Sequence, residues 1–217
     1  MSKNSLLEIQ NLSISLPDGG DRSHAVENLN LEIIENEILC VVGESGSGKS
    51  MMARSIMGLL PRRLKITGGE IKFEDCLLNH LTPKQFQKIR GLSIAMIFQE
   101  PMSALNPLHS IGKQIEEVLF LHTSINKTER RQRILEMLSA VHLPEPQHVI
   151  QAYPHEISGG QRQRAMIAMA LILEPKILIA DEPTTALDVT TQAQILKLIR
   201  DLQREKQTGV IFITHDF

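Results

Sequence analysis

The chain has 217 residues, a formal net charge of −2 and 22% charged residues. This length is enough for one sizeable domain, and the charge balance lacks the basic excess that nucleic-acid binders usually carry. Aromatic residues make up only 3% and tryptophan is absent, which argues against stacking platforms for single-stranded nucleic acid. We therefore expect a globular protein with no nucleic-acid partner.

The two cysteines and the apolar segments bear on compartment and membrane topology. Cys40 and Cys76 are isolated, so they give neither a disulfide framework nor a zinc pattern and favour a reducing compartment. We expect Cys40, within an apolar run, to be a buried small hydrophobe. The N-terminus lacks the apolar core of a signal peptide, and no apolar run reaches membrane-spanning length. The sequence predicts a soluble chain that can still dock on a membrane protein.

The first third of the chain predicts mainly strands. Residues 6–16 and 25–33 alternate apolar and polar side chains, with a Gly- and Asp-rich turn between them. The continuous apolar run 38–42 predicts a central strand that is buried on both faces. After a glycine-rich loop, residues 50–60 predict a helix that Pro61 stops.

The rest of the chain predicts short strands around a helical insertion. Strands are expected at 68–73 and 93–98, and again at 176–181 and 209–215. The residues between 100 and 158 have apolar side chains at helical spacing instead. The expected apolar faces of three helices are Ile111, Ile115, Val118 and Leu119, then Ile134, Leu135, Leu138 and Val141, and near the end Ile195, Leu198, Ile199 and Leu202. Strands alternating with helices favour an α/β fold with a mostly parallel sheet.

The run GESGSGKS, from Gly43 to Ser50, matches G-x-x-x-x-G-K-[ST] in full. Its glycines let backbone N–H groups surround phosphate oxygens, and the following helix points its positive end at the same anion. Lys49 can reach the β- and γ-phosphates, and the Ser50 hydroxyl can bind Mg²⁺. A mere glycine-rich turn is disfavoured by the strand before the loop and the helix after it. The loop predicts a nucleotide-phosphate site without specifying the reaction.

Two carboxylates follow the apolar run that ends at residue 180. Asp181 stands at the end of a predicted buried strand, beside the phosphate loop in such folds, where it can hold Mg²⁺. Glu182 comes next and can orient or deprotonate an attacking water. A solvated strand end is the alternative, which the intact phosphate loop makes less favourable.

A second run with anion-binding character is ISGGQ, residues 157–161, which leads into the apolar helix 161–173. Its backbone donors and helix N-terminus suit an anion. A second anion site in one chain is explained if it serves the nucleotide of a partner subunit. Arg162, Arg164 and the run 129–133 are by default solvated helix faces.

Six motifs in one order identify a family resemblance. The chain resembles the ATP-binding subunit of ABC transporters: GESGSGKS is similar to Walker A, IFQEP to the Q-loop, ISGGQ to the signature, ILIADE to Walker B, ALD at 186–188 to the D-loop, and FITHD to the switch-histidine segment. The runs 98–109, 153–171 and 180–196 resemble more narrowly the ATPases of dipeptide, oligopeptide, glutathione and nickel importers.

The resemblance implies ATP and Mg²⁺ as cofactors and assigns roles to named residues. Glu182 would be the catalytic base, His215 would contact the γ-phosphate, and Gln99 would sense the γ-phosphate and the metal. The metal-binding residues would be Ser50, Gln99 and Asp181. The nucleotide-binding residues would be Gly43, Glu44, Ser45, Gly46, Ser47, Gly48, Lys49, Ser50 and Met51, with Ser158, Gly159, Gly160, Gln161 and Asp188 acting across the dimer interface. Gln99 could otherwise be an ordinary loop glutamine and His215 an ordinary strand-end histidine.

The resemblance also implies an architecture. The expected fold is a P-loop NTPase core with a mostly parallel sheet, an N-terminal antiparallel β portion and an inserted helical subdomain. Residues 1–99 and 165–217 would form the nucleotide-binding core, which ends short of its relatives at Phe217 and would leave a sheet edge uncovered. Residues 100–164 would form the helical subdomain with the signature.

The implied function is an ATP-hydrolysing subunit that energises an importer for peptides or for a solute such as nickel or glutathione. Its partners would be a second ATPase subunit, identical or different, integral membrane permeases and, indirectly, a substrate-binding protein. It would work as a peripheral protein at the cytoplasmic face of the inner membrane. The alternative is an ATPase of a soluble metabolic complex, such as one for phosphonate breakdown, or a nucleotide-binding regulator without turnover.

One feature departs from the family pattern. Family members place an aromatic residue upstream of Walker A to stack on adenine, but here no aromatic residue precedes Phe73. His24 is the nearest planar candidate, and apolar residues are the other possible contact for the base.

Overall fold

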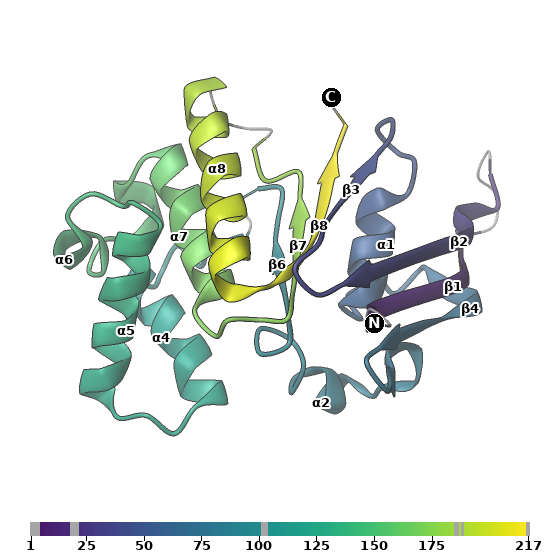
Figure 1. The fold of residues 1–217 in the computed structure, drawn as a ribbon, viewed down its shortest axis with the longest axis horizontal. Helices are drawn as coiled ribbons and strands as arrows, with labels where there is room; N and C mark the ends of the chain where they lie inside the picture. The colour runs from purple at the N-terminus through teal and green to yellow at the C-terminus, as the bar shows by residue number, and fades with distance from the viewer. Residues whose placement is uncertain (1–4, 18–21, 101–103, 185–186, 188, 216–217) are drawn as a thin grey trace.

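The computed structural model describes residues 5–17, 22–100, 104–184, 187 and 189–215. The structure contains two β-sheets: a parallel sheet in the middle, with a group of helices on one side of it, and an antiparallel sheet on the other side (Figure 1). The first sheet is antiparallel and has the strand order β2-β1-β4-β5. Its strands are β1 (Ser5–Ser15), β2 (His24–Ile34), β4 (Lys65–Phe73) and β5 (Cys76–Leu77).

The second sheet is parallel and has the strand order β3-β8-β7-β6. Its strands are β3 (Ile38–Val42), β6 (Ile94–Ile97), β7 (Ile177–Asp181) and β8 (Gly209–Thr214). All four strands point the same way, so their carboxyl ends meet at one edge. The expected fold, a mostly parallel sheet beside an N-terminal antiparallel portion, is confirmed.

Alternating side chains of the parallel sheet contribute to two different cores. Ile177, Ile179 and Ile211 face the core shared with the antiparallel sheet and α1 (Lys49–Ile56). Leu178 and Ala180 face the core shared with the helices. Every residue of β6 and β7 is buried, as their apolar runs predict.

The helices of the second core are α4 (Ile111–His122), α5 (Lys127–Ala140), α6 (Pro146–Val149), α7 (Gly159–Leu171) and α8 (Val189–Lys206), with the 3₁₀ turn η2 (Pro154–Glu156) before α7. The expected apolar faces lie inward: Ile111, Ile134 and Ile195 are all buried. The expected subdomain boundary at residue 164 falls within α7, so the extent of the helical subdomain stays a prediction. None of the described helices is long and apolar enough to cross a membrane.

The helix after the phosphate loop is shorter than expected. α1 ends at Ile56, and Gly58 takes a left-handed φ of 61°. Gly58 N–H then donates to the Ser55 carbonyl at 3.0 Å, so a glycine terminates the helix before Pro61 is reached. The side chain of Arg90 donates to the carbonyl oxygens of Met57 and Gly58, both at 2.8 Å. The next short helices are η1 (Leu78–His80) and α2 (Pro83–Phe86).

The expectation of a doubly buried central strand at residues 38–42 was wrong. β3 is one of the two edge strands of the parallel sheet as described, and pairs there with β8 alone. One of its faces packs against the core through Leu39 and Val41, whereas the other leaves Ile38 41% and Val42 38% exposed. Cys40 is on that outer face and is exposed, not buried as expected. An apolar run alone does not distinguish an edge strand from a central one.

Candidate functional site

The phosphate loop follows β3 and is closed by its own lysine. Lys49 Nζ donates to the carbonyl oxygens of Gly43 at 2.5 Å and Glu44 at 2.9 Å, and to Ser47 Oγ at 3.3 Å. Gly48 has a φ of 96°, and a Cβ there would stand 2.2 Å from the carbonyl oxygen of Ala25. Glycine is therefore required at Gly48 for two reasons, its conformation and the close approach of β2.

Ser50 and Asp181 meet beside this loop, although 131 positions separate them in the chain. Ser50 Oγ donates to Asp181 Oδ1 at 3.1 Å, and Asp181 is only 4% exposed. Burial raises the pKa of Asp181 above its ordinary value of 3.8, and the Ser50 hydrogen bond partly opposes this effect.

A hydroxyl and a buried carboxylate are the donors that Mg²⁺ takes from proteins, usually with substrate phosphates completing its shell. Among the described residues no group of three or more His, Cys, Asp or Glu side chains could hold a metal. The Ser50 hydroxyl and the Asp181 carboxylate together fit a Mg²⁺ ion that also takes phosphate and water oxygens.

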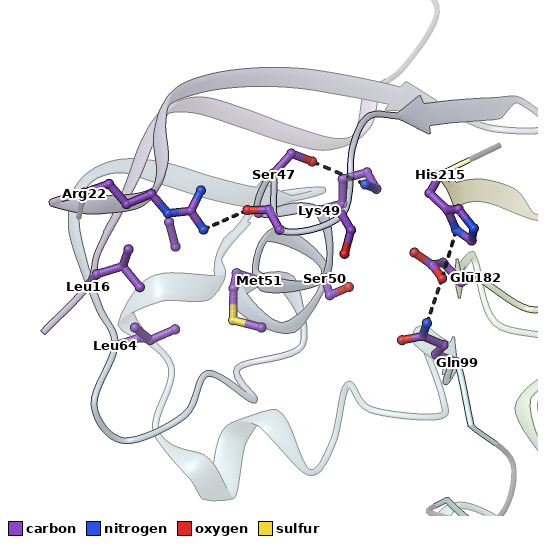
Figure 2. Close-up of a pocket in the computed structure, with 14 residues that line it drawn as sticks. Leu16, Arg22, Ser47, Lys49, Ser50, Met51, Leu64, Gln99, Glu182 and His215 are labelled. Carbon is purple, nitrogen blue, oxygen red and sulfur yellow. Dashed lines mark hydrogen bonds and ion pairs between the residues drawn. The ribbon is translucent and has the colours of Figure 1, made fainter. Parts of the chain in front are cut away.

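Three polar side chains gather where the next three strands end. Glu182 follows β7, Gln99 follows β6 and His215 follows β8. Gln99 Nε2 donates to Glu182 Oε2 at 2.7 Å, and His215 Nδ1 lies 3.2 Å from the same oxygen (Figure 2). Glu182 has a left-handed φ of 46°, an unusual conformation for a residue with a side chain and a frequent one at functional sites. The parallel sheet thus brings together three residues that the sequence predicted separately.

One cavity of about 540 Å³ joins this cluster to the phosphate loop. Gln99, Glu182 and His215 lie at one end of it, as Figure 2 shows, and the loop with Lys49 and Ser50 lies in the middle. The predicted loop residues from Ser45 to Met51 all line this cavity. Gly43 and Glu44 contribute through the carbonyl oxygens that Lys49 contacts.

The signature segment does not line this cavity. Ser158 is the N-cap of α7, where its Oγ accepts from Gln161 N at 3.3 Å and its N–H donates to Gln161 Oε1 at 2.8 Å. Ser158 and Gly159 are exposed. The next position, Gly160, has Thr191 Cγ2 3.2 Å from where its Cβ would stand. The structure therefore does not bring Ser158–Gln161 to the chain's own phosphate loop.

Two arginines behind the signature were expected to be solvated, but they are only partly exposed and are hydrogen-bonded to the protein. Arg162 Nη1 donates to the carbonyl oxygens of Ile157 at 2.5 Å and Pro154 at 3.1 Å. Arg164 donates to the Val141 carbonyl at 3.0 Å and to Gln194 Oε1 at 2.6 Å. Both side chains hold backbone around α7. Asp188, the predicted interface residue, lies outside the described residues.

At the remaining end of the cavity, sequence reasoning identified Met51 and missed the other lining residues. This end is lined by Leu16, Ala25, Met51 and Leu64, which we call the apolar slot, and by Arg22. These residues come from four separate segments and form no local pattern. His24, the planar candidate, does not line the cavity and instead has its Nδ1 2.9 Å from Ser23 Oγ.

Known proteins resemble this chain over most of its length. The family profile described as "ABC transporter" matches residues 26–185. The oligopeptide transport ATP-binding protein OppD of Bacillus subtilis (strain 168) is 50% identical over 97% of this chain and 59% of its own length. The dipeptide transport ATP-binding protein DppD of the same strain is also 50% identical, over 97% of this chain and 63% of its own length. The chain thus spans less than two thirds of these relatives.

A solved structure resembles the fold as a whole. The ATP-binding cassette MJ0796, in a dimeric post-hydrolysis state bound to ADP and Pi, superposes with a TM-score of 0.85 and 35% identity, covering 97% of this chain and 88% of the other. The phosphate loop, the cluster at the strand ends and these likenesses agree, and the chain belongs to the ABC transporter family.

Proposed function

We propose that this chain binds and hydrolyses ATP with Mg²⁺ and so energises an importer of peptides. The observation that carries the proposal is the single cavity that joins the phosphate loop to Gln99, Glu182 and His215. The substrate class is supported by relatives named for oligopeptide and dipeptide transport. Nickel and glutathione, which the motifs also allow, do not appear in those names.

When a nucleotide enters, polar groups of the phosphate loop would first exchange their contacts within the protein for contacts with the nucleotide. Lys49 is held by the carbonyl oxygens of Gly43 and Glu44, so an entering triphosphate would offer its ammonium group more strongly charged acceptors. Ser50 and Asp181 would hold Mg²⁺, which when bound neutralises charge on the phosphates.

Glu182 would act as the general base toward the attacking water. Its Oε2 accepts from Gln99 and pairs with His215, so that oxygen is occupied without nucleotide. A γ-phosphate would draw Gln99 and His215 toward itself, and the carboxylate would then become free to accept a proton. Binding and activation would thereby be linked through two side chains.

The second half of each site would come from another subunit. Ser158, Gly159, Gly160 and Gln161 present a helix N-terminus away from the chain's own loop, which suits a phosphate held by a partner. Asp188 would lie at that interface. We further propose that permeases anchor the chain at the cytoplasmic face of the inner membrane and that a substrate-binding protein delivers the peptide.

Glu182→Gln tests the assignment of the base. We expect ATP hydrolysis by the full-length subunit to fall at least about 100-fold, because general-base catalysis contributes that much or more, while ADP affinity stays within about threefold. Glu174→Gln is the matched control, since Glu174 pairs with Lys206 outside the cavity. Hydrolysis that survives Glu182→Gln at the wild-type rate would overturn the assignment.

A soluble metabolic complex is the competing function. Genes for integral membrane permeases next to this one would support the importer. Neighbouring genes that encode only soluble enzymes, together with a tagged chain that purifies free of membranes, would support the competitor.

A further inference from the structure

The apolar slot is a preformed part of the cavity. Leu16, Met51 and Leu64 are half-buried and pack against the core beneath the antiparallel sheet, and Ala25 is 6% exposed. Side chains held in this way by a core keep a fixed surface. They leave an apolar surface in contact with the cavity next to the phosphate loop.

Arg22 is fixed at the same end of the cavity. Its Nη2 donates to the carbonyl oxygen of Gly46, in the phosphate loop, at 2.7 Å. Figure 2 shows Arg22, Leu16, Leu64 and Met51 grouped on one side of the loop, with Gln99, Glu182 and His215 on the other. No Phe, Tyr or Trp is among the described side chains that line the cavity. The planar group at this end is therefore the guanidinium of Arg22.

We propose that the nucleobase of the nucleotide lies between the guanidinium of Arg22 and the apolar slot. This inference rests on the proposed function, because it requires the phosphates to occupy the adjoining loop. A guanidinium plane stacks on a base as an aromatic ring does, and the aliphatic side chains cover the opposite face. Arg22 thus takes the place of the aromatic residue that the sequence lacks.

This arrangement discriminates weakly between bases. Strong selection against a related base requires buried polar groups that hydrogen-bond its edge, whereas apolar contacts reject an analogue only modestly. Arg22 is the only polar side chain among the described residues of this end of the cavity. Adenine and guanine nucleotides are expected to bind with affinities within about tenfold of each other.

The competing role for Arg22 is a simple charge contact with phosphate. Equilibrium titration in MgCl₂ separates the two roles when ADP, GDP and inorganic pyrophosphate are compared. Stacking affects ADP and GDP but not pyrophosphate, whereas a charge contact affects all three. Because Arg22 is exposed, its substitution is not expected to unfold the chain.

The decisive variants differ in whether the side chain at position 22 has a planar group and whether it carries a charge. We expect Arg22→Ala and Arg22→Lys to weaken ADP about fivefold to tenfold, with pyrophosphate within about twofold. Arg22→Tyr, which restores a plane without charge, should bind ADP at least as tightly as wild type. Arg63→Lys is the matched control, since Arg63 adjoins Leu64 in the chain but does not line the cavity.

Other outcomes of these titrations would each contradict one specific claim. Equal loss of ADP and pyrophosphate affinity in Arg22→Ala, with Arg22→Lys close to wild type for both, would make Arg22 a phosphate contact. Unchanged ADP affinity in Arg22→Ala, or a preference for ADP over GDP above 100-fold, would refute the base site and leave the proposed function intact. Wild-type protein that binds neither ADP nor pyrophosphate would refute the proposed function itself.

Discussion

Asp181 and Glu182 are neighbours in the chain but have different environments. Asp181 is the last residue of β7 and is buried against Ser50. One residue later the backbone turns to a φ of 46°, and Glu182 faces the strand ends with Gln99 and His215. A single change of backbone direction therefore places the two carboxylates in different surroundings, one buried beside the phosphate loop and the other facing the ends of the strands.

The negative charge on Asp181 should lower the free energy of unfolding of the nucleotide-free protein. Burial raises the pKa of Asp181 above 3.8, so the folded chain binds this proton more tightly than the unfolded chain does. The protonated carboxyl group therefore stabilises the folded state fully at pH values below the pKa of the unfolded state. This stabilisation is lost as the pH rises through the pKa of the folded state. Without nucleotide or Mg²⁺, Asp181→Asn should therefore have a higher free energy of unfolding than wild type at pH 7.

Urea unfolding of both proteins over a pH series measures this difference. It should shrink as pH falls toward 3.8 and below, where the carboxyl is protonated in both states. Asp201→Asn is the control, because that carboxylate is 52% exposed. A gap between Asp181→Asn and wild type that stays constant with pH would contradict this account.

The sequence predicts the ionisable residues in and beside the cavity better than the apolar residues that shape it. Lys49, Asp181 and Glu182 belong to motifs in which the chemistry fixes residue type and spacing. Leu16 and Leu64 are aliphatic residues in separate segments, and nothing in their pattern distinguishes them from ordinary core. Their part in the cavity arises from tertiary packing alone.

At the level of elements, glycine decides where α1 ends. Gly58 has a left-handed φ of 61°, and a Cβ there would stand 2.5 Å from Cε2 of Phe86 in α2. Gly91 has a similar φ of 79°, but the nearest atom to its Cβ would be 3.9 Å away. The two positions share conformational strain and differ in steric contact.

Replacing each of these two glycines by alanine separates the cost of backbone strain from the cost of a steric clash. Gly91→Ala should lower the free energy of unfolding by about 1–2 kcal/mol, the cost of a left-handed conformation for alanine. Gly58→Ala should cost about 1–3 kcal/mol more, because the helix end and α2 would have to move apart. Urea denaturation at equal pH measures both. Equal losses would show that Phe86 yields without cost and that the contact does not fix the helix end.

Element boundaries depend on contacts that a linear pattern does not contain. The buried strands β6 and β7 were predicted correctly because both faces of each are covered. β3 has the same apolar composition and, like β6, lies at an edge of the described sheet, but one of its faces is uncovered, with Ile38 and Val42 exposed. Which faces of a strand the other elements cover is therefore the part of the fold that periodicity could not supply.

At the scale of the whole molecule, the separated signature predicts sites shared between subunits. Lys49→Ala should disable a chain's own loop, and Gly159→Asp should repel the phosphate that the chain serves on its partner. A Cβ at Gly159 meets nothing closer than 3.8 Å, and an acidic side chain at a helix N-terminus favours the helix. Gly159→Asp should therefore fold normally.

Mixing the two variants tests the prediction. In a mixed dimer one site combines both defects, and the other combines the intact loop of one chain with the intact signature of the other. For a homodimer with random pairing, about a quarter of wild-type ATP hydrolysis should return, because half the dimers have one of two sites intact. Each variant alone is the control. No gain on mixing would count against shared sites.

The pairing of β3 with β8 also has a consequence for biosynthesis. Ile38 pairs with Val210 and Val42 with Thr214, so the strand that leads into the phosphate loop obtains its described neighbour from the opposite end of the sequence. Contacts between such distant residues form late and slow folding. On the ribosome, the loop emerges early and then waits, its strand unpaired, until nearly all of these residues have been translated. We therefore expect nucleotide to support only the late steps of folding, after β8 has paired with β3.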